Sequence, residues 1–119
     1  MTALELAQKA AVILDNKKAD ELKVLGIQEL SVLADYFVLA TGTSSTHVKA
    51  LADEVEFQLK ENGIMADHVE GYRSNAWILL DYGHVVIHVF TGEARQFYDL
   101  DRLWKDAETI SLDFLSQAE

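Results

Sequence analysis

The feature that most constrains the fold is a pair of apolar segments separated by two residues. Residues 77–82 read WILLDY, residues 85–90 read VVIHVF, and Gly83 and His84 lie between them. Apolar runs of this length predict β-strands, and a two-residue connection requires them to pair antiparallel as a hairpin. Alternation divides the first strand into two faces: Trp77, Leu79 and Asp81, and Ile78, Leu80 and Tyr82. Because both faces are partly apolar, one of them is a candidate surface for a partner.

The rest of the chain alternates helical and strand patterns. Thr2 and Glu5 form a T-x-x-E capping box, which predicts an amphipathic helix over residues 3–17. A second helix is predicted from the capping residues 43–45 to about Asn62. Further strands are predicted at residues 22–27, 36–41 and 64–71, and one or two helical turns at residues 97–104. This order predicts an α/β domain with a mixed sheet of about five strands flanked by helices.

Chain length and composition indicate a single domain. A chain of 119 residues can bury its own core. We expect the domain to occupy residues 1–107 and a polar C-terminal tail, with a weak helical pattern, to occupy residues 108–119. The absence of cysteine excludes disulfides, thiolate catalysis and cysteine-ligated zinc. No apolar run approaches the roughly 18 residues of a membrane span, and the N-terminus does not resemble a signal peptide. We therefore expect a cytoplasmic protein without a membrane partner.

The charge is strongly acidic and uneven. Ten basic and twenty acidic residues give a formal charge of −10. Residues 1–30 carry five acids and four bases, residues 31–70 seven and two, and residues 71–119 eight and four. Direct nucleic-acid binding is not expected, because it relies on clustered Lys and Arg. A basic protein surface is the more natural partner, since opposite potentials speed and orient docking, although acidity also serves solubility.

The turn at residues 42–45, Gly-Thr-Ser-Ser, is the first candidate for chemistry. Backbone amides at such a strand-to-helix turn can attract an anion. It is not a phosphate-binding loop, because no Gly-Lys-Ser/Thr follows. A nucleotidyltransferase would also need two strand carboxylates two residues apart, whereas Asp67 and Glu70 are three apart and should face opposite sides. Helix capping is the favoured interpretation, and a nucleotide-binding enzyme is the alternative.

The remaining polar clusters favour structural roles. His84 and His88 are four residues apart, which on a strand separates them by about 13 Å, too far to share a metal ion. His88 lies within an apolar strand, so a buried imidazole there needs a hydrogen-bond partner. Asp99 and Asp101 form a D-x-D at a predicted helix start, where aspartate commonly caps. We predict no metal site, no cofactor and no catalytic residue.

Aromatic residues concentrate in one part of the chain. Residues 77–104 contain six of the eleven aromatic residues. These six are Trp77, Tyr82, Phe90, Phe97, Tyr98 and Trp104. Some must belong to the core, but Trp and Tyr beside acidic residues are typical of hot spots that bind basic proteins.

Four segments of the chain form a specific combination. They are DYFVLATGTSSTH (35–47), VEG (69–71), WILLDYGHVVIHVF (77–90) and FYDLDRLW (97–104). Each is weak alone, but together they resemble the Iojap-like ribosomal silencing factors, with similarity up to about Ala107. Two positions depart from the family pattern: His84 stands where Asp or Asn is usual, and Asp101 where Glu is common.

The resemblance implies a fold related to nucleotidyltransferases without their catalytic metal site, and no chemistry or cofactor. It implies binding to the large ribosomal subunit through its ribosomal protein fourteen, which would block subunit joining and repress translation. Relatives are also linked to large-subunit maturation. The expected partner-binding residues are Glu70, Trp77, Asp81, His88, Phe90, Tyr98, Leu100, Leu103 and Trp104. Core positions are expected at Phe37, Leu79 and Val86. A homodimerising module is the other alternative.

Overall fold

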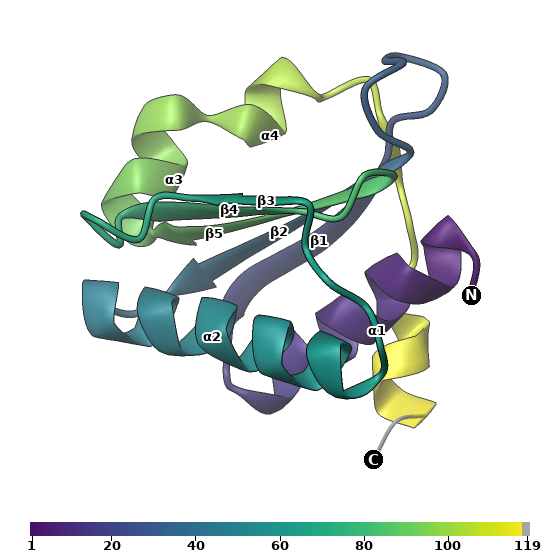
Figure 1. Ribbon diagram of the computed structural model, residues 1–119. Helices are drawn as coiled ribbons and strands as arrows, with labels where there is room; N and C mark the ends of the chain where they lie inside the picture. Colours follow the sequence, from purple (N-terminus) through teal and green to yellow (C-terminus); the bar gives the residue numbers. More distant parts are fainter. Residues whose placement is uncertain (118–119) are drawn as a thin grey trace.

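The computed structural model describes residues 1–117 and contains a six-stranded sheet with helices on both faces (Figure 1). The helices are α1 (Ala3–Asn16), α2 (Ser45–Glu61), α3 (Gly92–Tyr98), α4 (Leu100–Leu103) and a 3-10 helix, η1 (Asp113–Gln117). The strands are β1 (Asp20–Gly26), β2 (Tyr36–Gly42), β3 (His68–Glu70), β4 (Trp77–Asp81), β5 (Val85–Thr91) and β6 (Glu108–Thr109). The predicted mixed α/β architecture is confirmed. Within residues 1–117, no helix has the length and apolar character needed to cross a membrane.

The strand order across the sheet is β3-β4-β5-β2-β1-β6. The predicted hairpin is present: β4 and β5 pair antiparallel, with Trp77 opposite Phe90 and Asp81 opposite Val86. The Asp81 carboxylate accepts a 2.7 Å hydrogen bond from the Gly83 amide, which helps to close the turn. β2 and β5 pair parallel at the centre, and this pair makes the sheet mixed.

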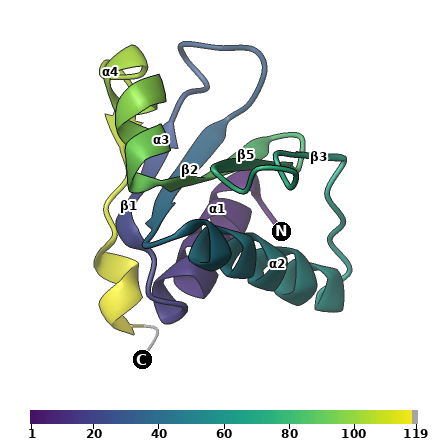
Figure 2. The same ribbon diagram turned by 90° about the vertical axis from the view of Figure 1, so that its left-hand side faces the viewer.

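Helices α1 and α2 cover one face of the sheet (Figures 1 and 2). Their fully buried residues include Ala11 and Leu14 of α1 and Leu51 and Val55 of α2. Inward side chains of four strands pack against them: Val24, Val38, Ala40, Ile78, Leu80, Ile87 and Val89. A fully buried Leu, Ile or Val contributes roughly 1.5–3 kcal/mol, so this layer is the main core.

Helices α3 and α4 lie across the opposite face, toward β1 and β2 (Figure 2). They enclose a smaller buried cluster: Leu25, Ile27, Ala34, Leu39, Phe90, Ala94 and Leu100. Within the described chain, these helices do not extend over β3 (Figure 2), and Leu79 and Asp81 of β4 stay partly exposed. One face is thus fully layered and the other only in part.

The turn before α2 serves capping, as predicted. Ser44 Oγ accepts a 3.1 Å hydrogen bond from the His47 amide. The Nε2 atom of His47 lies 2.9 Å from the Lys17 carbonyl oxygen, so this ring ties α2 to the end of α1. Glycine is required at Gly42 by close packing, because an added Cβ would lie 2.9 Å from the Val48 amide nitrogen.

The segment predicted as a polar tail contributes to the fold. Its first residues form β6, with Thr109 opposite Leu25 of β1. Ile110, Leu112 and Phe114 then pack against the main core. A two-residue edge strand has too short a pattern to be read from sequence, which is why the sheet has six strands where about five were predicted.

Two other element boundaries differ from the prediction. The strand predicted at residues 64–71 is restricted to His68–Glu70. The helical turns predicted at residues 97–104 begin earlier, at Gly92. Thr91 caps that helix by accepting a 3.2 Å hydrogen bond from the Ala94 amide. Glycine is a poor helix former, so its position inside the first turn hid the start of α3.

Candidate protein-docking surface

The α3–α4 layer presents large apolar side chains to solvent. We define the α3–α4 surface as Trp77, Phe97, Tyr98, Leu103 and Trp104. Phe97 is 80%, Leu103 70% and Tyr98 49% exposed, and the two tryptophans are half-buried. Grouped exposure of such side chains marks an interaction site, whereas isolated exposed apolar residues are ordinary.

Ring contacts hold one end of this surface in place. Tyr98 packs on Trp77 with ring centroids 4.6 Å apart, and Phe97 meets Tyr98 edge-on at 5.0 Å. Trp77 in turn stacks on Phe90 at 5.1 Å, and Phe90 is buried. Rings fixed in this way lose little conformational freedom when a partner binds.

The loop before β4 also supports Trp77. Gly71 has a φ of +98°, and an added Cβ would lie 1.9 Å from the Trp77 carbonyl oxygen. A side chain at Gly71 would therefore displace this loop from Trp77. The same segment leaves Glu70 exposed on the edge strand, with the His68 Nε2 atom 3.3 Å from its Oε1.

His88 lies beneath the centre of the surface. The Trp77 indole donates a 3.2 Å hydrogen bond to its Nδ1, which provides the predicted partner. Phe37 packs edge-on against His88 at 4.7 Å and against Trp104 at 5.1 Å, so these rings connect the two tryptophans. Burial, aided by the charge of Arg95, lowers the pKa of His88 to about 4. The ring is therefore neutral near pH 7, with its proton on Nε2, and Nε2 has no hydrogen-bond partner among the described residues.

A buried arginine locks α3 to α4 and to the sheet. Arg95 donates two hydrogen bonds to the Asp101 carboxylate, of 2.8 and 3.0 Å. It donates a third, of 3.0 Å, to Thr41 Oγ1 on β2. Lys23 on β1 adds an ion pair of 2.9 Å to Asp101. The Arg95 and Lys23 side chains hold the pKa of Asp101 well below its usual range, so the carboxylate stays charged and the bidentate pair stays formed.

The two aspartates of the D-x-D differ in role. Asp99 caps α4, as predicted, by accepting a 3.3 Å hydrogen bond from the Arg102 amide. Its left-handed backbone, with φ 49° and ψ 52°, places a sharp bend between α3 and α4. Asp101 lies in the first turn of α4 and serves as the partner of Arg95. In the part of the chain that the structure describes, no three His, Cys, Asp or Glu side chains are grouped to hold a metal ion.

The nine predicted partner-binding residues separate by exposure. Three are exposed: Glu70, Tyr98 and Leu103. Three are partly exposed: Trp77, Asp81 and Trp104. The other three are buried and support the surface from below: His88, Phe90 and Leu100. Direct contact with a partner is therefore a prediction for the first six only.

Two residues of this region, Phe97 and Arg95, were not predicted from the sequence. Phe97 belongs to the aromatic cluster but was not among the predicted site residues, although it is the most exposed member of the surface. The structural role of Arg95 could not be predicted, because its hydrogen-bond partner Thr41 is distant in sequence. Phe37 and Leu79, like Val86, were expected in the core but are only partly buried, since the helix layer on this face is incomplete.

Comparison with known proteins identifies the family. The family model described as "Ribosomal silencing factor during starvation" matches residues 1–119. The chain belongs to the ribosomal silencing factor family. The ribosomal silencing factor of Bacillus subtilis is 39% identical over 114 residues, which cover 96% of this chain and 97% of the relative. The chloroplast Iojap protein of Zea mays is 29% identical, over 98% of this chain and 49% of that longer protein. The predicted resemblance is confirmed.

Solved structures agree with the fold. A crystal structure of a Chromobacterium violaceum protein has a TM-score of 0.85 and 36% identity, covering 88% of each chain. A second, from Bacillus halodurans, has a TM-score of 0.76 and 36% identity, covering 91% of this chain and 95% of the other.

Proposed function

We propose that this ribosomal silencing factor binds the large ribosomal subunit through ribosomal protein fourteen, blocks joining of the small subunit and so represses translation. The observation that carries the proposal is the α3–α4 surface, an exposed aromatic cluster in a chain of this family. On this proposal the protein acts by occupancy and not by catalysis. We expect it to act in the cytoplasm, where ribosomal subunits join.

The α3–α4 surface has the physical properties of an interface hot spot. Interface energy concentrates in a few Trp, Tyr and Arg side chains that lose contact with water. Here Tyr98 and Phe97 stand at the rim of a shallow hollow of about 610 Å³ between α3 and α4, with Leu103 also in its lining. A partner side chain placed in this hollow would exclude water from both rings.

The charge distribution favours a basic protein partner. The chain carries a net charge of −10. On the partly exposed face of the sheet, Glu70 lies opposite Leu79, and Asp81 lies at the end of β4 away from Trp77. Arg102, Lys105 and Asp99 also line the hollow, so its local charge is mixed. We therefore propose that Glu70 and Asp81 attract the basic partner electrostatically, and that the α3–α4 surface makes the contacts from which water is excluded.

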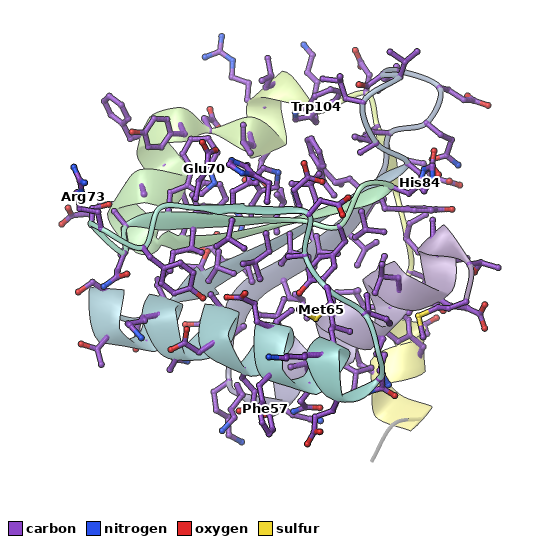
Figure 3. All side chains as sticks on the ribbon, in the orientation of Figure 1. Phe57, Met65, Glu70, Arg73, His84 and Trp104 are labelled. Atoms are coloured by element: carbon purple, nitrogen blue, oxygen red, sulfur yellow. The ribbon has the colours of Figure 1, made fainter. Side chains whose placement is uncertain are left out.

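Co-sedimentation with purified large subunits, followed by addition of small subunits, tests the proposal. We expect the wild-type protein to pellet with large subunits and to reduce the yield of joined ribosomes. Tyr98→Ala should weaken large-subunit binding by about tenfold or more, as expected for a hot-spot residue. Phe57→Ala is the matched control, because Phe57 is 59% exposed but belongs to α2, on the other side of the molecule (Figure 3).

Different outcomes contradict different parts of the proposal. A folded Tyr98→Ala or Trp77→Ala variant with wild-type affinity would contradict the site. A wild-type protein that stays in the supernatant at micromolar concentration would contradict the function itself. A nucleotide that raises Tm in the presence of magnesium would favour the enzyme alternative, and a dimer mass in light scattering would favour the self-association alternative.

A further inference from the structure

The loop between β1 and β2 exposes a second group of apolar side chains. Val32 is 103%, Leu33 85% and Leu30 49% exposed. The ends of the same loop are anchored in the smaller core, where Ile27 is 0% and Ala34 4% exposed. The loop therefore buries its ends and presents its aliphatic tip to solvent, which is unfavourable unless a partner covers it.

Hydrogen bonds at its base give the loop a defined shape. The amides of Leu30 and Ser31 each donate a 2.9 Å hydrogen bond to the Ile27 carbonyl oxygen. The Leu33 amide donates one of 3.0 Å to Ser31 Oγ, and the Ile27 amide donates one of 2.8 Å to the Asp35 carbonyl oxygen. A pre-shaped apolar tip loses less conformational freedom on docking than a loose one does.

The loop lies on the same side of the sheet as the α3–α4 surface. Both views place it beside α4, above the face that α1 and α2 do not cover (Figures 1 and 2). Trp104 lies at the end of α4 that is nearest to the loop (Figure 3). Six large exposed hydrophobic residues share this side: Leu30, Val32, Leu33, Phe97, Tyr98 and Leu103. A partner that lies across this side can contact the loop and the α3–α4 surface together.

The charge below the loop indicates what kind of partner fits. A hollow of about 320 Å³ separates the loop from the segment after α4, and Leu30 lines it together with the carboxylates of Glu29, Asp106 and Glu108. A Lys or Arg side chain can lay its apolar stem on Leu30 and its charged head against these carboxylates. A second copy of this acidic chain, or a nucleic-acid backbone, would bring like charge to the same place.

We propose that residues 30–33 and the acidic hollow below them form a second docking point for a basic protein surface, engaged together with the α3–α4 surface. The inference rests on the proposed function, because it extends the footprint on the same large-subunit partner. The matching partner surface carries an apolar patch beside a Lys or Arg.

Large-subunit co-sedimentation of a Val32→Ser, Leu33→Ser double variant tests this inference. We expect binding to weaken by about tenfold, because the aliphatic contact is lost on docking. The matched control is Phe57→Ser with Met65→Ser, two residues that are 59% and 61% exposed and lie on the α2 side (Figure 3), and we expect it to bind like wild type. A triple variant, Glu29→Gln, Asp106→Asn and Glu108→Gln, should bind more weakly at low salt and show a smaller effect of added salt.

The outcomes separate the second docking point from the proposed function. Wild-type-like sedimentation of the double variant, beside normal wild-type binding, would overturn the second docking point alone. An equal loss in the control variant would overturn it too, because the effect would not belong to this loop. Failure of the wild-type protein to sediment would overturn the proposed function as well. Thermal melts of all variants should match wild type, since every changed position is on the surface.

Discussion

The two faces of the sheet carry similar apolar side chains but bury them to different extents. On the α1–α2 face, Ile78 and Leu80 of β4 are fully buried. On the other face, their neighbours Trp77 and Leu79 remain partly exposed. One well-covered face can therefore supply most of the stability. The second face is then free to keep apolar side chains at the surface.

The two faces are also held by different interactions. Apolar packing holds α1 and α2, whose buried residues form a continuous cluster with the sheet. A polar network holds the shorter α3 and α4: Arg95 donates to Asp101 and Thr41, and Lys23 forms an ion pair with Asp101. Short helices bury little apolar area, so packing alone would not fix their position on the sheet. Directional hydrogen bonds and ion pairs fix it instead.

The largest expected effect compares neighbouring leucines on opposite faces. Leu80→Ala should lower the free energy of unfolding by about 2–5 kcal/mol, because it leaves a cavity in the main core. Leu79→Ala should lower it by about 1 kcal/mol, since that side chain is only partly buried. Urea unfolding of both variants measures the difference. Equal losses would mean that both faces contribute alike to stability.

The next effect concerns protonation beneath the open face. The pKa of His88 is about 4 in the folded chain, against an ordinary value of 6.5. Between these values the unfolded chain binds more protons, so acidification from about pH 7 to about pH 4 should remove up to roughly 3 kcal/mol of stability. Urea unfolding across this range should show a steeper loss for wild type than for His88→Gln. Parallel profiles would contradict the buried neutral imidazole.

A smaller effect is expected from the charged network. Asp101→Asn should lower the free energy of unfolding by about 1–2 kcal/mol, because Arg95 loses its charged partner. The lowered pKa of Asp101 means that this contribution is present above about pH 4 and fades as the pH falls further. Asp53→Asn is the control, since its ion pair with Lys49 is exposed and of little value. Urea unfolding at about pH 7 and about pH 3 should show the gap between wild type and Asp101→Asn shrinking.

The smallest effect on stability is expected at the most exposed ring. Phe97→Ser should change the free energy of unfolding by no more than about 0.5 kcal/mol, because little of this side chain is buried. Its large-subunit binding should nevertheless fall. A thermal melt and a sedimentation assay on the same preparation measure both. A marked loss of Tm would place Phe97 among the supporting residues.

The main core could be predicted from sequence because it rests on local periodicity. The hairpin needed only the alternation of residues 77–82 and a two-residue turn, and its observed register agrees. The capping box at Thr2 and Glu5 was equally local, and both of its hydrogen bonds are present. Features of this kind depend on residues a few positions apart.

The α3–α4 surface and the loop at residues 30–33 were harder to predict, because they depend on contacts between residues that are distant in sequence. Arg95 meets Thr41 across 54 positions, and neither residue carries a pattern that points to the other. The exposure of Val32 and Leu33 could not be predicted either, since a mainly apolar segment around Ser31 is equally compatible with a buried connector. The motif positions did not separate the exposed Tyr98 from the buried Phe90.

The chain has two tryptophans, and both belong to the α3–α4 surface, so intrinsic fluorescence reports on this surface. Trp77 and Trp104 both pack on the smaller cluster beneath α3 and α4, and neither belongs to the main core. Tryptophan emission from the unlabelled protein should therefore shift when a partner covers this surface. The main core under α1 and α2 contains no tryptophan and contributes nothing to this emission. Binding could be followed by stopped-flow fluorescence, with no dye to disturb the surface being measured.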